Sequence, residues 1–320
     1  MEVTRLVCLD TVMLDVAFEI EDLPERGGDA LAQSRTMSAG GGFNVMSAAR
    51  RQGLSVAYLG QLGHGPLADL ARHTLEDEGI DLLTAPSSPL DIGVCVVLVD
   101  AEAERTFVTS PGAELTLSAT DLTDVAWAPG DVVYLSGYDV VYPELARVIV
   151  PWLKGVSDRV RVSFDPGPRT LDIAPDVLDL VLSRTDWLLC NAREATHLTT
   201  RDDPLRALHA LHERGDFAGV VVRLGASGCL VSSGEETLRA EGFAVQALDS
   251  NGAGDVHNGV VLASLANGEP LSVVVRRANA AAALSVTRFG PATGPTREEL
   301  DAFLRARDGE GAVSRVESYD

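Results

Sequence analysis

The chain has 320 residues, of which 46% are hydrophobic and 23% charged, and its formal net charge is −21. This apolar fraction excludes a disordered protein. The sequence contains neither an apolar run of about 18 residues nor a basic start followed by a long apolar segment, so we expect no membrane span and no secretory signal. A strongly acidic chain repels nucleic acid and anionic membranes, and neither is an expected partner.

The number and positions of the lysine and cysteine residues limit the kinds of catalytic and metal site that we expect. Of the 26 basic residues only Lys154 is a lysine, and it lies at an expected helix end, where a cation is favoured without any further role. A lysine-containing phosphate loop or a Schiff-base lysine is therefore not expected. Four cysteines stand far apart in apolar runs, which predicts reduced thiols in a cytoplasmic protein and neither disulfides nor zinc: Cys8, Cys95, Cys190 and Cys229.

The expected elements begin with a strand over 3–9 and short strands with turns over 12–38. A glycine-rich loop then leads into a helix that closes at Gly53, followed by a strand over 55–60, a helix over 66–78, and a hairpin over 92–99 and 105–109. Beyond this point strands and helices mostly alternate. Strands are expected over 131–136, 160–165, 186–190, 219–224 and 228–233, and helices over 142–154, 176–183, 204–214, 254–267, 270–287 and 296–306.

This alternation predicts one α/β domain over 1–308, a doubly wound, mostly parallel sheet with helices on both faces. Two β-rich stretches, about 12–38 and 91–110, have no helices of their own to cover them. We expect them to pair into a small sheet that acts as a lid over the strand ends and also joins two chains as a homodimer. The polar segment 309–320 is expected to be loose.

The segment DSNGAGD is the strongest candidate for a functional site. Gly252, Ala253 and Gly254 have little or no side chain and precede a predicted helix, so their N–H groups form an anion site at its N-terminus. Asp255 follows in the first turn. A carboxylate there is either a helix-stabilising acid or a base held beside a phosphate.

This segment resembles the C-terminal signature of the ribokinase-like (PfkB) carbohydrate kinases. Other segments resemble further motifs of that family, in the family's order and over most of the chain. They are Gly41, Gly42 and Asn44 with Gly53 and Gly63; Asn191-Ala-Arg-Glu194; Arg223-Leu-Gly225-Ala-Ser-Gly228; and the helix and loop over 278–290.

The resemblance implies an ATP-dependent kinase that phosphorylates a hydroxyl of a small sugar. Asp255 is then the general base, and Gly252, Ala253 and Gly254 are the anion hole for the transferred phosphoryl group. On the acceptor side it implies sugar contacts by Asp15, Gly41, Gly42 and Asn44. The alternatives are a turn or edge-strand charge for Asp15 and a helix N-cap for Asn44.

For the nucleotide, the resemblance implies ATP contacts by Asn191, Gly225, Gly228 and Asn279, and a role for Glu194 in holding Mg²⁺ through bound water. The 191–194 spacing is equally that of a capping box. The glycine turn is otherwise an ordinary hairpin turn, and Asn279 otherwise a solvated residue on an alanine-rich helix.

Asp249, Asn251 and the loop over 288–290 match the family's monovalent-cation positions, which implies a K⁺ site. Asn251 stands where a small or hydroxyl residue is usual, and this departure leaves K⁺ dependence open. His257 is interpreted as a structural residue on an apolar helix. Arg105 and Arg169 are interpreted as surface charges.

Three alternatives remain open. The acceptor is a sugar or, as the runner-up, a nucleoside. A nicotinamide-dependent oxidoreductase built on Gly40 to Gly42 is weaker, because Val45 holds the place of the third glycine and no hydrophobic strand precedes the motif. A non-catalytic sugar-binding regulator is disfavoured by the presence of both Asp255 and the Gly-Ala-Gly segment.

Overall fold

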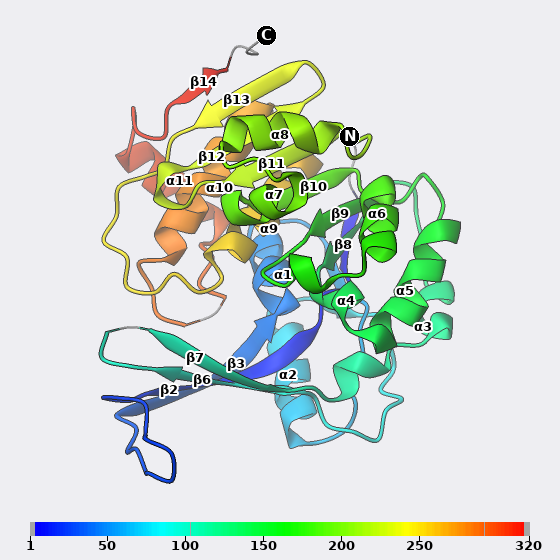
Figure 1. Cartoon of the computed structure of the whole chain (residues 1–320), viewed down its shortest axis with the longest axis vertical. Coiled ribbons are helices and arrows are strands. Elements are labelled where there is room, and N and C mark those ends of the chain that lie inside the picture. Colours follow the sequence, from blue (N-terminus) through cyan, green and yellow to red (C-terminus); the bar gives the residue numbers. More distant parts are fainter. Residues whose placement is uncertain (1–3, 103, 291, 317–320) are drawn as a thin grey trace.

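The computed structural model describes residues 4–102, 104–290 and 292–316. Its main feature is a ten-stranded sheet flanked by helices (Figure 1). In spatial order the strands are β14 (Val313–Arg315), β13 (Glu236–Ala240), β12 (Cys229–Ser233), β11 (Gly219–Arg223), β10 (Trp187–Asn191), β9 (Arg161–Asp165), β8 (Asp131–Ser136), β1 (Arg5–Cys8), β4 (Val56–Tyr58) and β5 (Asp81–Leu82).

The strands from β11 to β5 are parallel, and β12 to β14 add an antiparallel edge. Their central segments are almost wholly apolar and buried, as strands covered on both faces must be. The predicted doubly wound sheet is confirmed. The prediction of a loose tail is wrong for residues 313–315, which pair with β13 and protect its otherwise open edge.

Helices cover both faces of this sheet and enclose two apolar cores. On one face lie α1 (Gly42–Arg51), α2 (Pro66–Asp77), α9 (Ala253–Ala266), α10 (Leu271–Ser285) and α11 (Arg297–Ala306). On the other lie α3 (Ala119–Thr123), α4 (Tyr138–Val141), α5 (Pro143–Gly155), α6 (Pro175–Arg184), α7 (Ala192–Thr199) and α8 (Pro204–His212). No helix among the described residues is both long and apolar enough to cross a membrane.

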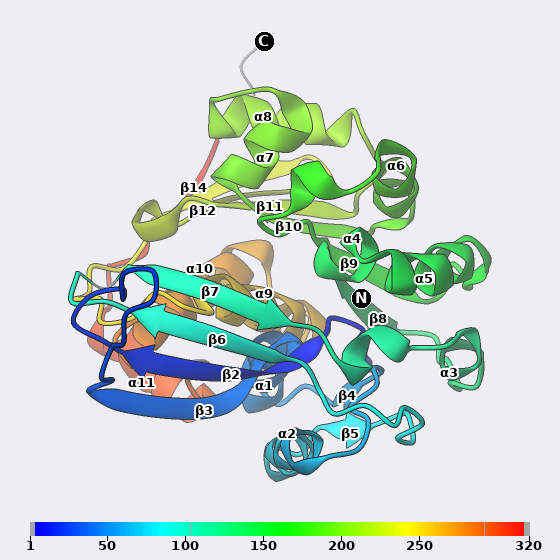
Figure 2. The same ribbon diagram turned by 60° about the horizontal axis from the view of Figure 1, so that its bottom comes forward.

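The two β-rich stretches form a separate four-stranded sheet, as predicted (Figure 2). Its order is β3 (Ser34–Gly41), β2 (Val12–Glu19), β6 (Val94–Val99) and β7 (Arg105–Ser110), and the parallel pairing of β2 with β6 joins the two stretches. We call this sheet the lid. Leu14 and Ala39 are buried at its root, where α2 packs on it, whereas the far end projects from the domain.

Candidate active site

The loop before α9 places Asp255 and the predicted anion hole at the end of the large sheet. Gly252 caps the helix with a φ of 71°, a left-handed conformation that favours glycine. Ala253 and Gly254 then form the first turn, and Asp255 follows as its acidic residue. The N–H groups of a helix's first turn have no partners within the helix, so this turn presents donors to an anion beside a carboxylate.

Close packing of α9 on α1 brings the acceptor-side loop to this carboxylate. A side chain on Gly259 would meet the backbone oxygen of Val45 at 2.5 Å, so only glycine allows the two helices this approach. Asn44 then donates from Nδ2 to Asp255 Oδ2 at 3.1 Å, and its Oδ1 accepts from the Ala292 amide at 2.9 Å. Asn44 is buried inside α1, whose N-cap is Gly41, so the N-cap alternative for Asn44 is wrong.

Burial raises the pKa of Asp255 to about 6, with a further contribution from the negative charge of Asp165. The bond from Asn44 and the guanidinium of Arg223 oppose this rise. A carboxylate with a pKa near 6 is ionised at neutral pH yet binds a proton more readily than an exposed aspartate. These are the properties of a general base.

The lid contributes Asp15, which lies on the site-facing side of β2. Gly40 on the neighbouring strand leaves room for it, because a Cβ there would lie 2.2 Å from Asp15 Oδ2. Burial raises the pKa of Asp15 to about 6. Gly41 and Gly42 pack against the backbone oxygens of Thr11 and Asp10, which a Cβ would approach to 2.3 and 2.4 Å, so close backbone approach by itself requires glycine at both positions.

Asn191 and Glu194 form the capping box of α7. Asn191 Oδ1 accepts from the Glu194 amide at 2.9 Å, and Glu194 Oε2 accepts from the Asn191 amide at 2.8 Å. Glu194 is buried, and burial together with the negative charge of Asp165 raises its pKa to about 7. The capping interpretation of the pair is therefore confirmed, while its part in binding Mg²⁺ stays a prediction.

A buried ionic network beneath the anion hole was not predicted. Arg223, at the end of β11, pairs with Asp165 at 3.0 Å and with Glu194 at 3.6 Å, and donates to Asn258 Oδ1. Asn258 Nδ2 donates to Asp165 Oδ2 at 2.6 Å. The available sequence signal for this network was the polar residue that ends each of the apolar strands β9 and β11. Because parallel strands end at one edge of the sheet, such residues lie close together.

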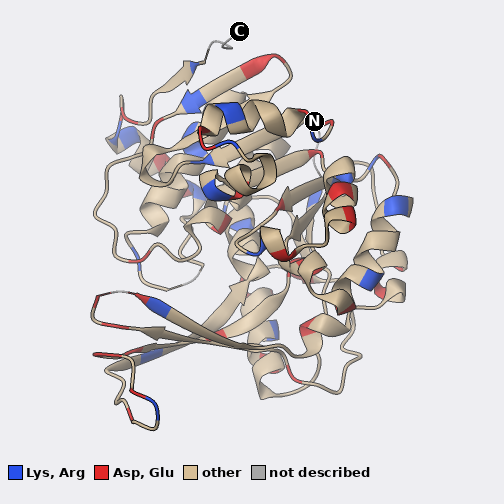
Figure 3. Ribbon diagram, in the orientation of Figure 1, with Lys and Arg blue, Asp and Glu red and all other residues tan. Residues whose placement is uncertain are grey.

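A surface cavity of about 490 Å³ adjoins this network. Its lining includes Asn191 and Gly225 of the predicted nucleotide site together with Arg193, Arg223 and Arg239. Figure 3 shows basic residues on the elements around it, in a chain that is otherwise acidic.

The turn after β11 requires glycine at two positions. Gly225 has a φ of 60° and Gly228 one of 89°, and a Cβ on Gly228 would meet the Ala240 oxygen at 2.0 Å.

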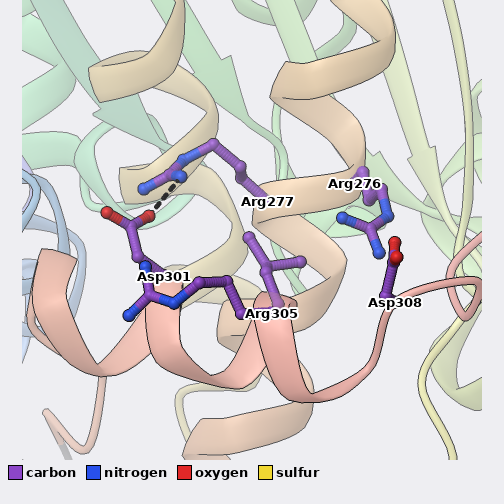
Figure 4. Close-up of a pocket in the computed structure, with 6 residues that line it drawn as sticks. Arg276, Arg277, Asp301, Arg305 and Asp308 are labelled. Carbon is purple, nitrogen blue, oxygen red and sulfur yellow. Dashed lines mark hydrogen bonds and ion pairs between the residues drawn. The ribbon is translucent and has the colours of Figure 1, made fainter.

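A second cavity of about 440 Å³ lies between α10 and α11 (Figure 4). Two of its three arginines are already engaged within the protein. Arg277 pairs with Asp301 at 2.6 Å, and Arg276 donates to the backbone oxygen of Glu310 at 3.0 Å. None of the predicted site residues lines this second cavity, so we place the candidate site at the cavity beside the buried network.

Asn279 is buried against the backbone of Ala240 and Glu241, which also lies beside Gly228, and its contact with ATP stays a prediction. Its Nδ2 donates to the backbone oxygens of Ala240 and Glu241 at 3.2 and 3.0 Å, and its Oδ1 lies 3.1 Å from Nε2 of His257. Both side chains are buried, and burial lowers the pKa of His257 to about 3, so the ring is neutral. The solvated alternative for Asn279 is wrong, and the structural interpretation of His257 is supported.

Both carboxylate oxygens of Asp249, one of the predicted cation residues, accept from hydrogen-bond donors. Asp249 forms an ion pair with Arg105 of the lid and accepts from the amides of Asn251 at 2.8 Å and Gly290 at 3.1 Å. Arg105 is therefore not a surface charge, contrary to prediction. Arg169 is exposed, pairs with Asp172 at 2.9 Å, and agrees with its surface interpretation.

An unpredicted carboxylate pair lies beside Asp255 at the ends of β1 and β8. Ser136 donates from Oγ to Asp10 at 2.6 Å and from its amide to Asp139 at 2.7 Å. Asp139 is fully buried, and burial raises its pKa to about 7. Burial and the charge of Asp139 also raise the pKa of Asp10.

Together the fold and the site define a class: an α/β protein with a buried carboxylate in the first turn of a glycine-capped helix and a separate small sheet beside it. The PfkB family model for carbohydrate kinases matches residues 3–298, and the chain belongs to this family of phosphotransferases. The β3 glycines lie in the lid and not in a strand–helix–strand unit, so the dinucleotide-binding interpretation is wrong.

The chain is similar to the uncharacterised sugar kinase YegV of Escherichia coli, with 31% identity over 92% of each chain. It is 26% identical to a ribokinase of Haemophilus influenzae, over 93% of this chain and 98% of that one. Arabidopsis thaliana ribokinase, solved with ribose and ATP, has a similar fold, with a TM-score of 0.75 and 23% identity over 95% of this chain and 99% of that one.

Proposed function

We propose that the protein transfers the terminal phosphoryl group of ATP to a hydroxyl of a small, unphosphorylated sugar, with Asp255 as general base. The hydrogen bond between Asn44 and Asp255 carries the proposal. It joins the acceptor-side loop to a carboxylate that stands in the first turn behind Gly252 to Gly254. Proton acceptor, anion donors and acceptor loop therefore meet at one place, as phosphoryl transfer to an alcohol requires.

In this proposal Asp255 takes the proton from the attacking hydroxyl, which lies between the lid and the end of the large sheet. The amides of Gly252, Ala253 and Gly254 donate to the oxygens of the transferred phosphoryl group, where negative charge must be held. Asp15 accepts hydrogen bonds from other hydroxyls of the sugar and orients it. The lid excludes water, which otherwise competes as an acceptor.

The arginine-lined cavity supports the proposal that ATP binds beside β11. Arg193, Arg223 and Arg239 give an acidic protein a local positive site for a polyphosphate, and Gly225 lets the chain approach it closely. Asn191 borders the same cavity. Arginine here takes the place of lysine, which is almost absent from this sequence.

The residues fit a hydrated Mg²⁺ better than a directly bound one. Among the described residues no group of three or more His, Cys, Asp or Glu is arranged to hold a metal. Glu194 keeps acceptor capacity beyond its bonds to Asn191, and Asp165 lies near it, so both suit the waters of a magnesium ion. When bound with ATP, Mg²⁺ neutralises phosphate charge.

Charge on the acceptor side favours a neutral substrate. Asp10 follows β1, Asp139 lies in α4 just beyond β8, Asp255 lies in the first turn of α9, and the charge of Asp15 in the lid acts on Asp255. Asp15 and Asp255, with pKa values of about 6, are ionised at neutral pH and repel a substrate that already carries a phosphate, whereas a polyol donates hydrogen bonds to them. A nucleoside also meets this requirement and is the second candidate.

An ADP-release assay across sugars, sugar phosphates and nucleosides, with Mg²⁺ present, tests the proposal. We expect turnover with at least one unphosphorylated sugar, and its loss in the Asp255→Asn variant. Turnover only with nucleosides would select the second candidate. Binding of a nicotinamide dinucleotide without any binding of ATP would refute the kinase proposal.

We further propose that two chains associate through the outer face of the lid. Met37, Val16, Val96 and Val108 lie in register across its four strands. Met37 is 42% exposed and Val108 61%, which is a poor arrangement for a face in water. Light scattering after gel filtration should give a dimer for the wild type and for Leu31→Glu, a control in the exposed loop, and a monomer for Val108→Glu.

The four cysteines support a reducing, cytoplasmic location, which we propose on this ground. All four are free thiols and each lies in a strand, with Cys95 of the lid only half-buried. Thiols of this kind persist where disulfides do not form. Thiol labelling of the denatured protein, taken directly from cells, should modify all four.

A further inference from the structure

The ion pair between Arg105 and Asp249 connects the lid to the segment that leads into the anion hole. Arg105 is the first residue of β7, and Asp249 lies 144 positions later in the chain. Both side chains are largely enclosed, with 21% of the arginine and 9% of the aspartate exposed. An enclosed pair is screened less by salt than a surface pair, and its loss has a larger effect.

Asp249 also organises the backbone around it. Its Oδ1 accepts from the Asn251 amide at 2.8 Å, and its Oδ2 accepts from the Gly290 amide at 3.1 Å. The amides of Leu248 and Asp249 both donate to the Val286 oxygen, at 2.7 and 3.1 Å. One carboxylate thereby holds the lid, the loop before Gly252 and the loop after α10.

These partners do not fit the K⁺ ion that the family resemblance implies at Asp249 and Asn251. A K⁺ ion needs oxygen atoms that converge on it in place of its hydration shell. Here both oxygens of Asp249 accept from N–H groups, and a guanidinium supplies the positive charge directly. Arg105 and K⁺ carry the same charge, so the carboxylate is neutralised without an ion from solution.

We propose that Arg105 is a tethered cation that replaces K⁺, and that it positions the anion-hole loop only while the lid lies against the body of the protein. The body is the ten-stranded sheet with the helices that cover it. When the lid lifts, Asp249 loses its counter-charge while its two amide partners stay within the body. Closure of the lid over the acceptor is thereby coupled to the order of the loop that carries Gly252 to Gly254. Arg105 acts through Asp249 and is a positioning residue. This inference rests on the phosphoryl transfer proposed above.

The test compares wild type with Arg105→Gln and Arg105→Lys, in buffers containing either K⁺ or tetramethylammonium. Arg35→Gln is the matched control, because Arg35 is an exposed lid arginine on β3 without an ion pair to any described residue. Wild type and Arg35→Gln should have equal kcat in the two buffers. Without K⁺, Arg105→Gln should lose about 10- to 100-fold in kcat, the cost of misplacing a catalytic loop.

K⁺ should restore part of the loss in Arg105→Gln, and Arg105→Lys should retain most of the activity because it keeps the charge. Thermal unfolding supplies a readout without turnover: K⁺ should raise the midpoint of Arg105→Gln by about 2 °C or more and leave wild type unchanged. If no acceptor is found, the proposed function fails but this shift still tests the tethered cation.

Three results would overturn the inference. One is a wild type that needs K⁺ for full activity. Another is an Arg105→Gln variant as active as Arg35→Gln without K⁺. The third is a loss in Arg105→Gln that K⁺ repairs neither in rate nor in thermal midpoint, since Arg105 is then only a structural contact of the lid.

Discussion

The body and the lid contribute to one site by different physical means. In the body, Asp165, Glu194, Arg223 and Asn258 form a buried network whose members satisfy one another, and the helices above are packed through Gly259. In the lid, Leu14 and Ala39 at the root are fully buried, while the far end reaches the body through the single ion pair of Arg105 among the described residues.

We infer from this difference that the body carries out the chemical step and that the lid controls access of the substrate. A preorganised, buried network holds charges in place without reorganisation during the reaction. A sheet that is anchored at its root and fastened at its far end by one ion pair opens while the body stays folded, as the proposed cover over a substrate must. Mutations in the body should therefore change the rate of the chemical step or the stability. In the lid, a mutation of Asp15 should change acceptor binding, whereas a mutation of Arg105 should change kcat through the loop that Asp249 holds.

The largest effect is expected for Asp255→Asn. The amide keeps an oxygen that accepts from Asn44 but no longer takes a proton, so kcat should fall by about 10²- to 10⁴-fold, roughly 3 to 5 kcal/mol of barrier. The KM for ATP should stay the same or fall. Asp176→Asn is the matched control, an acid in the first turn of α6, and should leave kcat unchanged. A folded Asp255→Asn variant with near-normal kcat would contradict the catalytic role.

Arg223→Gln should affect stability most. It leaves Asp165 and Glu194 buried without a counter-charge, and we expect a loss of about 3 to 5 kcal/mol in the free energy of unfolding. Urea denaturation measures this loss. Arg193→Gln lines the same cavity from a position outside the network and should change the unfolding free energy by less than about 0.5 kcal/mol. Equal stability of the two variants would show that the network does not stabilise the fold.

Asp15→Ala should act on the acceptor alone. Loss of a charged hydrogen-bond acceptor should raise the KM for the sugar by about 10- to 100-fold, with kcat and the KM for ATP nearly unchanged. Initial-rate kinetics with each substrate varied separately gives the three constants. Glu19→Ala, at the exposed end of β2, is the control. A change confined to the ATP constants would place Asp15 outside the acceptor site.

The smallest effects concern pH. Asp255 and Asp15 both have pKa values of about 6, so kcat should fall and the acceptor KM should rise as the pH drops below 6. Burial raises the pKa of Asp255 above its ordinary value of 3.8, so the folded state binds the extra proton, and the stability this provides is lost as the pH rises through 6. Above pH 6, Asp255→Asn should therefore be more stable than wild type, and the difference should grow between pH 5 and pH 8. Equal stability of the two proteins at pH 5 and pH 8 would contradict the raised pKa.

The sequence predicted the layers of this protein and the segments that we propose carry its chemistry. Alternating apolar runs and helix formers are local signals, and they predicted the parallel sheet with small errors in its element bounds, apart from the two-residue edge strand β5, which was not predicted. Glycines before a helix are likewise a local signal, so the sequence alone identifies the segment from Gly252 to Asp255. The β13 and β14 strands were not predicted, because Glu236–Ala240 and Val313–Arg315 are short and carry polar residues at the sheet edge.

Only the tertiary structure decided which of these residues meet. Asn44 is an N-cap by local rules, yet the approach of α1 to α9 carries its amide to Asp255, 211 positions away. Asn279 is a helix polar residue by the same rules and is buried against His257 instead. Arg105 has the local signature of a surface charge, and the pairing of β2 with β6 brings it to Asp249. Contacts across the sequence depend on register and packing, and a single sequence contains no local signal for either.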